Sequence, residues 1–399
     1  MDSEEKKEFY RQFKDANELS AHLQAIFKEG VEHLLEAELD EHLGYEKYAS
    51  TGRGSGNSRN GKSSKQLQTE LGPIELEVPR DRNGSFEPKL VPRHSRVMAV
   101  VEEKIISLYA KGMSVRDISE QIEEIYGVSL SDSSVSNITN KILPQVREWQ
   151  DRPLNRQYLM VWMDGMVFKV RDGRKVINKC LHLVLGLNTE GRKEVLGMWI
   201  SQKESASFWL GVLNDLRARG VEDVLIFVTD NLKGLPEAIE GSFPEARTQL
   251  CIVHQVRSSA KYVAYKERKR VISQMREIYK APSLDAAQEA LRVFKGSWNA
   301  KYPYAIKSWE TNWERLTTYF DYPPEIRTIM YTTNVIESFN SAVRKFTRNK
   351  MTLPSNEALL KAVFLAQKRI SRNWNKRIPN WPLVLTQFKI LYGDRIEEG

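Results

Sequence analysis

The chain has little cysteine and no long apolar run. Its two cysteines, Cys180 and Cys251, among 399 residues argue against a disulfide framework and for a reducing compartment. No stretch approaches the roughly 18 uninterrupted apolar residues of a membrane-spanning helix. The first residues, M-D-S-E-E-K-K, lack the apolar segment of a signal peptide. These absences predict a cytoplasmic protein that does not enter a membrane.

The composition is that of a basic protein with enough apolar residues for packed cores. Hydrophobic residues make up 41% of the chain, and its length favours two to four domains. The net charge of +8 favours polyanions, of which nucleic acid is the commonest large one, although a merely basic protein would have the same charge. Residues 1–50 hold 13 acidic and 6 basic residues, whereas residues 257–350 hold 9 acidic and 18 basic ones. We therefore expect DNA to avoid the first segment.

The first 80 residues suggest a helix, a polar segment and a hairpin. Apolar residues recur at helical spacing from Leu19 to Leu43, and this stripe needs a partner, either a second copy of the chain or its own domain. Residues 44–65 are rich in Gly, Ser, Asn and cations, which predicts an irregular segment. It is either a solvated linker or an arm that contacts DNA phosphates. The cations of such an arm are Arg53, Arg59, Lys62 and Lys65. The alternation that follows predicts a small β-hairpin ending near Pro79.

Residues 97–143 have the pattern of three helices. Gly112 ends the first, Ser114 and Gly127 bound the second, and the third begins near Ser131. The second and third have helix-turn-helix proportions, with the third as the reading helix. Its polar residues that would face DNA bases are Ser131, Ser133, Ser134, Ser136 and Asn137. The alternative is an ordinary three-helix packing unit.

From Tyr158 the pattern changes to strands. Three strands, a helix, the buried strand V-L-I-F-V-T-D, a short helix and a fifth strand, Q-L-C-I-V-H, follow one another. This is the element order of a ribonuclease-H-like fold. Asp164 then lies on the first strand and Asp230 at the end of the fourth, and parallel neighbouring strands would bring them together.

Residues 258–325 read as helical and basic, which predicts an all-α insertion in that fold. It carries Trp298, Trp309 and Trp313, which either stack on unpaired DNA bases or pack the core of the insertion.

Three carboxylates are candidates for a metal site. Asp164 interrupts an apolar run, where a carboxylate must be paired, protonated or metal-bound. Asp230 either caps the next helix or binds metal. Glu337 is favoured as the third acid over Glu325 and Glu357, because its helix continues with the DNA-binding candidates Arg344, Lys345 and Arg348. Such carboxylates bind two Mg²⁺ or Mn²⁺ ions, which can clamp the attacking and leaving oxygens of a phosphodiester.

Cys251 and His254 form half of a zinc site, and no second pair completes it, because Cys180 and His182 lie on another strand. His254 is a candidate to orient a phosphate or a metal-bound water, or else it is a structural histidine.

Several motifs in order resemble those of the bacterial Mutator-type insertion-sequence transposases. They are G-Y-x-x-x-x-x-x-G-x-x-x-x-N-x-R-N-G at 44–61, M-D-G at 163–165, T-D-N at 229–231, C-x-x-H at 251–254 and N-x-x-E-S-F-N at 334–340. The resemblance covers nearly the whole chain. It implies a DDE transposase that binds terminal inverted repeats, with a ribonuclease-H-like domain interrupted by a helical insertion. It also implies that Asp164, Asp230 and Glu337 are the catalytic triad and that Cys251 and His254 are an accessory pair.

The predicted function is metal-dependent DNA cleavage and strand transfer at the ends of an insertion sequence. The expected partners are the inverted repeats, target DNA and a second copy of the chain, since two DNA ends must be processed together; the expected location is the bacterial nucleoid. The predicted order is a helical segment at 1–45, the arm and hairpin at 46–94, the helix-turn-helix at 95–150, and the catalytic core at 155–257 and 326–399 around the insertion at 258–325. The rival functions are a Holliday-junction resolvase or nuclease and a DNA-binding regulator with an inactive catalytic domain.

Overall fold

The chain folds into two compact units, Met1–Lys141 and Ile142–Gly399, each with its own apolar core. The computed structural model describes residues 3–52, 54–93, 96–202, 205–231, 234–331, 334–348, 352–372, 374 and 376–396. The border between the units falls inside the segment 95–150 that the sequence suggested as one domain. No helix in the described ranges is long and apolar enough to cross a membrane.

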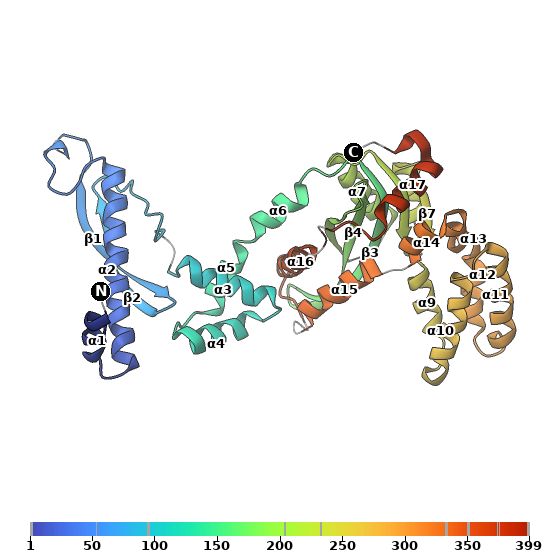
Figure 1. Cartoon of the computed structure of the whole chain (residues 1–399), viewed down its shortest axis with the longest axis horizontal. Helices are drawn as coiled ribbons and strands as arrows, with labels where there is room; N and C mark the ends of the chain where they lie inside the picture. The colour runs from blue at the N-terminus through green and yellow to red at the C-terminus, as the bar shows by residue number, and fades with distance from the viewer. Residues whose placement is uncertain are drawn as a thin grey trace. The chain divides into compact units, whose positions relative to one another are not determined.

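The first unit joins a long helix, a two-stranded sheet and four shorter α-helices (Figure 1). Its elements are α1 (Ser3–Arg11), α2 (Ala16–Leu43), the 3-10 helix η1 (Ser50–Gly52), β1 (Arg59–Thr69), β2 (Gly72–Asp81), α3 (Ala99–Ala110), α4 (Val115–Tyr126) and α5 (Asp132–Asn140).

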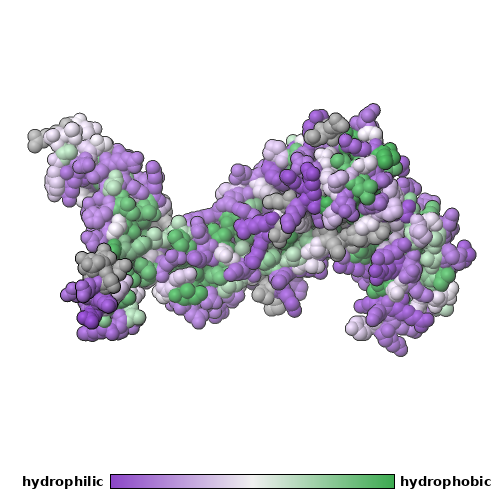
Figure 2. Space-filling view, viewed as in Figure 1, coloured by the Kyte–Doolittle hydropathy of each residue, from purple (hydrophilic) through white to green (hydrophobic). Residues whose placement is uncertain are grey.

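The apolar stripe of α2 is divided between the core and the surface. Val31 and Leu35 pack on the hairpin together with Leu67, Ile74 and Leu76, so part of the stripe has its partner within the unit. Three other large apolar side chains on this helix stay exposed; they are Leu23, Ile26 and Leu34. Figure 2 shows hydrophobic residues over part of α2 and the neighbouring hairpin on the visible face.

The hairpin is longer than the sequence suggested. It runs to Asp81, and β1 already begins at Arg59, inside the segment expected to be irregular. That expectation was wrong for residues 59–65, because hydrogen bonds to β2 supply a partner that the Gly- and Ser-rich composition does not reveal. The register shifts between Arg59 and Lys62, and Gly61, at φ 71°, adopts the left-handed conformation in this bulge.

Helices α3, α4 and α5 match the three predicted helices. The side chain of Ser114 caps α4 in a reciprocal capping box with Asp117, and Gly127 ends the helix at φ 63°. The hydroxyl of Ser131 accepts a hydrogen bond from the backbone N–H of Ser134 and so caps α5. Helix α5 packs on both α3 and α4.

The second unit is a five-stranded mixed sheet with helices on both faces (Figure 1). The strands lie in the order β5-β4-β3-β6-β7, with β3, β6 and β7 parallel and β4 antiparallel to β3 and β5. Up to the last strand, the elements are α6 (Leu143–Asp151), β3 (Gln157–Asp172), β4 (Lys175–Asn188), β5 (Lys193–Ser201), α7 (Ala206–Ala218), β6 (Asp223–Thr229), α8 (Leu235–Ser242) and β7 (Arg247–Leu250). The helices that follow are α9 (Ile252–Ala260), α10 (Tyr265–Tyr279), α11 (Leu284–Trp298), α12 (Pro303–Thr311), α13 (Trp313–Thr317), η2 (Thr318–Asp321), α14 (Pro324–Tyr331), α15 (Asn334–Thr347), α16 (Asn356–Ser371), α17 (Trp381–Tyr392) and η3 (Gly393–Arg395).

The central strand β3 separates two packed faces. Val161 and Met163 join the apolar cluster made with α7 and α8. Because side chains alternate along a strand, Asp164 points to the opposite face. Helix α15 contacts β3, and α16 contacts β5. The acid of the central strand therefore faces α15.

The fifth strand is shorter than predicted, and the expected strand at residues 251–254 was wrong. Strand β7 ends at Leu250, and Cys251 is the residue before α9. Strand β7 pairs with β6 over only four residues, so the backbone can turn into a helix after Leu250. Cys251 and His254 are consequently one helical turn apart instead of alternating along a strand.

Two of the three tryptophans in the helical stretch are core residues. Trp309 is 1% exposed and Trp298 is 7% exposed, and the indole N–H of Trp298 donates to the Gln274 side chain. Trp313 is only partly buried. Hydrophilic residues cover most of the visible surface of α10 and α11 (Figure 2). The core alternative therefore holds for Trp298 and Trp309.

Trp309→Ala should lower the free energy of unfolding by about 3–5 kcal/mol, because it removes a fully buried ring and leaves a cavity. Trp313→Ala is the matched control and should cost clearly less. Denaturant unfolding followed by circular dichroism measures both. Equal losses for the two variants would contradict the assignment of Trp309 to the core.

Candidate active site

The parallel pairing of β3 with β6 and of β6 with β7 ends at the same level of the sheet. Met163 on β3 pairs with Thr229 on β6, and Thr229 pairs with Leu250 on β7. The next residue on β3 is Asp164, and the residues just beyond the other two strands are Asp230 and Cys251. The backbone N–H of Cys251 donates to the Thr229 carbonyl at 2.8 Å, which extends this register past the last pair. Strand register thus brings Asp164, Asp230 and Cys251 together.

His254 lies between the two aspartates. It projects from the first turn of α9, with Nδ1 against Asp230 Oδ1 and Nε2 3.5 Å from Asp164 Oδ1. Burial disfavours its charged form, but the hydrogen bonds to Asp230 and Cys251 outweigh burial and raise the pKa of His254 to about 11. Both ring nitrogens face acceptors, so His254 is an imidazolium that neutralises part of the acidic cluster.

Asp164 is 4% exposed and is held by two hydrogen bonds. The backbone N–H of Gly165 donates to Oδ1 at 2.8 Å, and the side-chain amide of Asn340 donates to Oδ2. Burial is the main reason that the pKa of Asp164 rises to about 6; His254 opposes the rise and Asp230 adds to it. The amide of Asn340 therefore ties α15 to the central strand.

Glu337 precedes Asn340 by one helical turn on α15. Its Oε1 lies 2.7 Å from Nη2 of Arg257, which follows His254 by one turn on α9. Among the described residues, Glu337 is the one of the three rival acids that an ion pair ties to α9. Glu357 is exposed in the first turn of α16, and Glu325 lies in the first turn of α14.

The donor set fits a divalent cation. Asp230 Oδ1, Glu337 Oε1 and Asn340 Oδ1 are buried; the first two face His254 and Arg257, and Asn340 Oδ1 accepts no hydrogen bond from the described residues. Oxygen donors of this kind suit Mg²⁺ or Mn²⁺. Donor atoms of Asp230, Cys251 and His254 also lie within 4.8 Å of one another. The sequence did not suggest this third partner for the Cys/His pair, because Asp230 reaches it only through the strand register.

The residues suggested for DNA contact have different surroundings. Arg53 lies outside the described residues. Arg59 pairs with Asp40, Lys62 lies 2.6 Å from Glu36, and the ammonium of Lys65 donates to the Pro92 and Arg93 carbonyls. The hydroxyls of Ser133 and Ser134 lie within 2.9 Å of the Ser131 hydroxyl at the start of α5. Asn137 is exposed on α5, and Arg344, Lys345 and Arg348 are exposed on or just after α15.

The family model and the related sequences point to the same protein family. The family model "Transposase, Mutator family" matches residues 1–377. A probable transposase for an ISRM3-like insertion sequence element from Sinorhizobium fredii is 42% identical over 365 residues, which is 91% of this chain and 90% of the relative. The transposase for insertion sequence element IS256 in transposon Tn4001 from Staphylococcus aureus is 30% identical over 315 residues, covering 78% of this chain and 80% of the relative. The Drosophila P element transposase strand transfer complex aligns with 70% of this chain and 92% of that chain, at a TM-score of 0.37 and 10% identity.

Addition of Mg²⁺ or Mn²⁺ should raise the melting temperature of the full chain, because an ion that binds only the folded site stabilises it by mass action. Asp230→Asn should remove this increase, since it takes away an anionic ligand. Glu325→Gln, on α14, is the control and should keep it. Differential scanning fluorimetry over a metal titration measures the effect. An undiminished increase in Asp230→Asn would assign the ion to another site.

Proposed function

Given that the chain belongs to the Mutator family of transposases, we propose that it cuts the ends of an insertion sequence and joins them to target DNA at a two-metal site. DNA transposition is the function of the family. The proposed triad is Asp164, Asp230 and Glu337, with Mg²⁺ or Mn²⁺ as the ions. The observation that carries the proposal is the convergence of Asp164, within β3, and Asp230, just after β6, with a helix that bears Glu337 and donates a hydrogen bond from Asn340 to Asp164.

The second unit is proposed to be a ribonuclease-H-like domain with a helical insertion. Three antiparallel strands, a helix, a parallel strand, a helix and a further parallel strand are the order expected of that fold, with the first strand at the centre. The helices α10 to α14 intervene between α9, beside the sheet, and α15, which returns to β3. The insertion therefore separates Glu337 in sequence from the aspartates without separating it in the fold.

In the proposed reaction, water forms a new bond to a phosphorus atom at the element end, and the bond from that phosphorus to the 3′ oxygen breaks. The freed 3′-OH then attacks a phosphodiester of the target and displaces its 3′ oxygen. Asp164, Asp230 and Glu337 would hold the divalent ions, whose chemistry, when bound, would be to activate the attacking oxygen and stabilise the leaving oxygen. Asn340 fixes the orientation of Asp164. His254 is proposed to orient the phosphate or the attacking water.

DNA recognition is proposed to reside in the first unit. Helices α4 and α5 have the lengths and the short connection of a helix-turn-helix, and Asn137 on α5 is exposed for base contact. Ser133 and Ser134 are the other proposed contacts, although their hydroxyls also take part in the N-terminal cap of the helix. Arg344, Lys345 and Arg348 are proposed to hold DNA beside Glu337. The protein would act in the bacterial cytoplasm, on nucleoid DNA.

Asp164→Asn, Asp230→Asn and Glu337→Gln should each abolish metal-dependent cleavage of element-end DNA and leave binding of that DNA largely intact. The reason is that each change removes an anionic ligand but no exposed cation. Glu325→Ala, which changes the rival acid on α14, should retain activity. Cleavage products mapped to the nucleotide, with gel shifts in parallel, measure the two effects. Cleavage at the unmodified rate by any one of the three variants would remove that residue from the site.

The chain is proposed to act as a homodimer through α2. Leu23, Ile26 and Leu34 are 46%, 50% and 56% exposed, and their spacing by three and eight residues aligns them along one side of the helix. A second copy of this stripe is a fitting cover, because the acidic charge of α2 disfavours DNA as its partner. Two copies would also supply one active site for each DNA end.

Leu34→Glu should convert the dimer to a monomer, since it places a charge in the apolar contact. Leu71→Glu, at a similarly exposed leucine in the turn of the hairpin, is the control and should stay dimeric. Light scattering of the full chain, alone and with end DNA, gives the mass. A monomeric mass for the unmodified chain in both states would refute the dimer.

A further inference from the structure

A cationic cavity lies on the hairpin side of the first unit. Its volume is about 320 Å³, and it is bounded by β1, β2 and the segment that follows β2. Its polar lining comes chiefly from four cations and two amides, which are Lys65, Arg80, Arg82, Arg93, Asn60 and Asn83. None of the three arginines was among the residues that the sequence suggested for DNA contact.

The positive charge of this cavity is not neutralised within the unit. Arg80, Arg82 and Arg93 are exposed, and their side chains have no ion pair or hydrogen bond with the described residues. Burial, and after it the charge of Arg96, lowers the pKa of Lys65, as expected for an ammonium in cationic surroundings. The other cations of the hairpin differ, because Arg59 and Lys62 are paired with acids of α2. The arginines are therefore available to an external anion.

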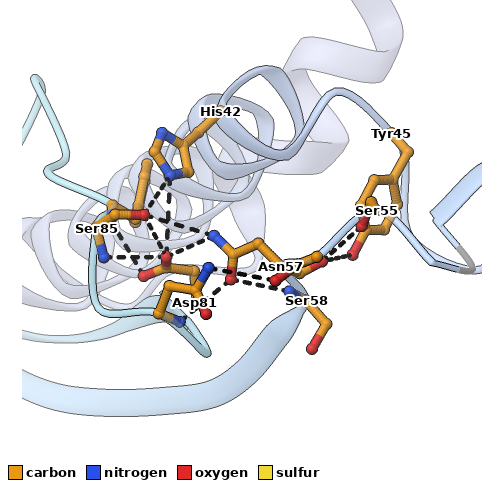
Figure 3. Close-up of polar contacts among 10 residues, drawn as sticks. His42, Tyr45, Ser55, Asn57, Ser58, Asp81 and Ser85 are labelled. Atoms are coloured by element: carbon orange, nitrogen blue, oxygen red, sulfur yellow. Dashed lines mark hydrogen bonds and ion pairs between the residues drawn. The ribbon is translucent and has the colours of Figure 1, made fainter.

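The acid in the cavity wall, Asp81, makes no ion pair with these three arginines, because other donors surround its carboxylate. It is 3% exposed and accepts hydrogen bonds from the Asn57 amide at 2.8 Å, from the Ser85 hydroxyl at 2.7 Å, and from the backbone N–H groups of Ser85 and Phe86 (Figure 3). Burial opposes ionisation, but these bonds hold the pKa of Asp81 below its ordinary value. Asp81 is thus a buried residue whose hydrogen bonds hold the end of β2 in place. Because neighbouring side chains on a strand alternate, the side chains of Asp81 and Arg80 point in opposite directions.

The same network fixes the shape of the cavity. The side-chain oxygen of Asn57 accepts from the backbone N–H of Asn83, and the backbone N–H of Arg82 donates to the Ser58 carbonyl at 2.7 Å. The hydroxyl of Tyr45 donates to the Asn57 carbonyl at 2.9 Å (Figure 3). Hydrogen bonds made by Tyr45, Asn57 and Ser58, in the motif at 44–61, therefore stabilise the turn after β2. The arginines project from a backbone that is already ordered.

We propose that this cavity binds a phosphate of the DNA backbone through Arg80, Arg82 and Arg93. The inference rests on the proposal that the first unit binds DNA, and it assigns the phosphate contact to residues outside the helix-turn-helix. Guanidinium groups bind phosphate oxygens through paired N–H donors, and the amides of Asn60 and Asn83 add neutral donors at the same wall. A phosphate contact of this kind orients the protein on duplex DNA without reading its sequence.

The test compares Arg82→Gln and Arg93→Gln with Lys89→Gln in the full chain. Lys89 is an exposed cation of the same segment that does not line this cavity. Fluorescence anisotropy over a salt series measures binding to an element-end duplex and to a scrambled duplex. Each arginine variant should weaken binding to both duplexes several-fold and reduce the slope of log Kd against log salt by about 0.9. Melting temperatures should not change, because these side chains make no described contact.

Arginine variants that match Lys89→Gln in affinity and in salt slope would overturn the proposal. The broader proposal is tested separately by the ratio of the two affinities in the unmodified chain. Equal binding of the end and scrambled duplexes would contradict specific recognition of the element end by this chain. A lowered salt slope in Arg82→Gln would support the phosphate site even in that case.

Discussion

Repulsion between clustered acids is the physical constraint on the second unit. The parallel pairing of β3, β6 and β7 stops at one level of the sheet, which brings Asp164 and Asp230 together, and α15 adds Glu337 on the face to which Asp164 points. Two like charges about 4 Å apart repel by roughly 4 kcal/mol at an effective dielectric constant of about 20. A fold of marginal stability cannot leave several such terms unopposed. The imidazolium of His254 and the guanidinium of Arg257 offset this repulsion by pairing with the acids.

The first unit also combines paired and unpaired charges, but here the unpaired groups are cations. Acids of α2 pair with Arg59 and Lys62, so these cations bind the long helix to the hairpin. Arg80, Arg82 and Arg93 make no such pair with the described residues, and donors enclose Asp81, the acid that lines the same cavity. A cation that holds the fold together is a poor ligand for DNA, because releasing it costs the internal pair. The unpaired arginines carry no such cost.

The sequence predicts the strands and helices well where patterns are long. The central strand, α4 with its capping serine and the terminating Gly127 follow directly from alternation and cap chemistry. It fails at residues 59–65 and 251–254, where pairing with a distant strand, or its early end, decides the structure. The acids of the candidate site were identifiable from their positions: Asp164 inside an apolar strand, Asp230 at a strand end and Glu337 on a helix with cations. Two of their partners, Asn340 and Arg257, were not, because these residues reach the acids only once α15 and α9 are adjacent.

The shortness of the edge strand β7 explains how cations come to lie beside the acids of the site. Had β7 continued to His254, alternation would have placed Cys251 and His254 on opposite faces of the sheet. Because the strand ends at Leu250, α9 begins beside the acids, and His254 and Arg257, three residues apart, lie on the same side of the helix. One helix therefore supplies both cations. The cations of α9 thus offset part of the negative charge of the acidic cluster within the protein itself. At the proposed metal site, a divalent cation would compete with His254 and Arg257 for the oxygens of Asp230 and Glu337.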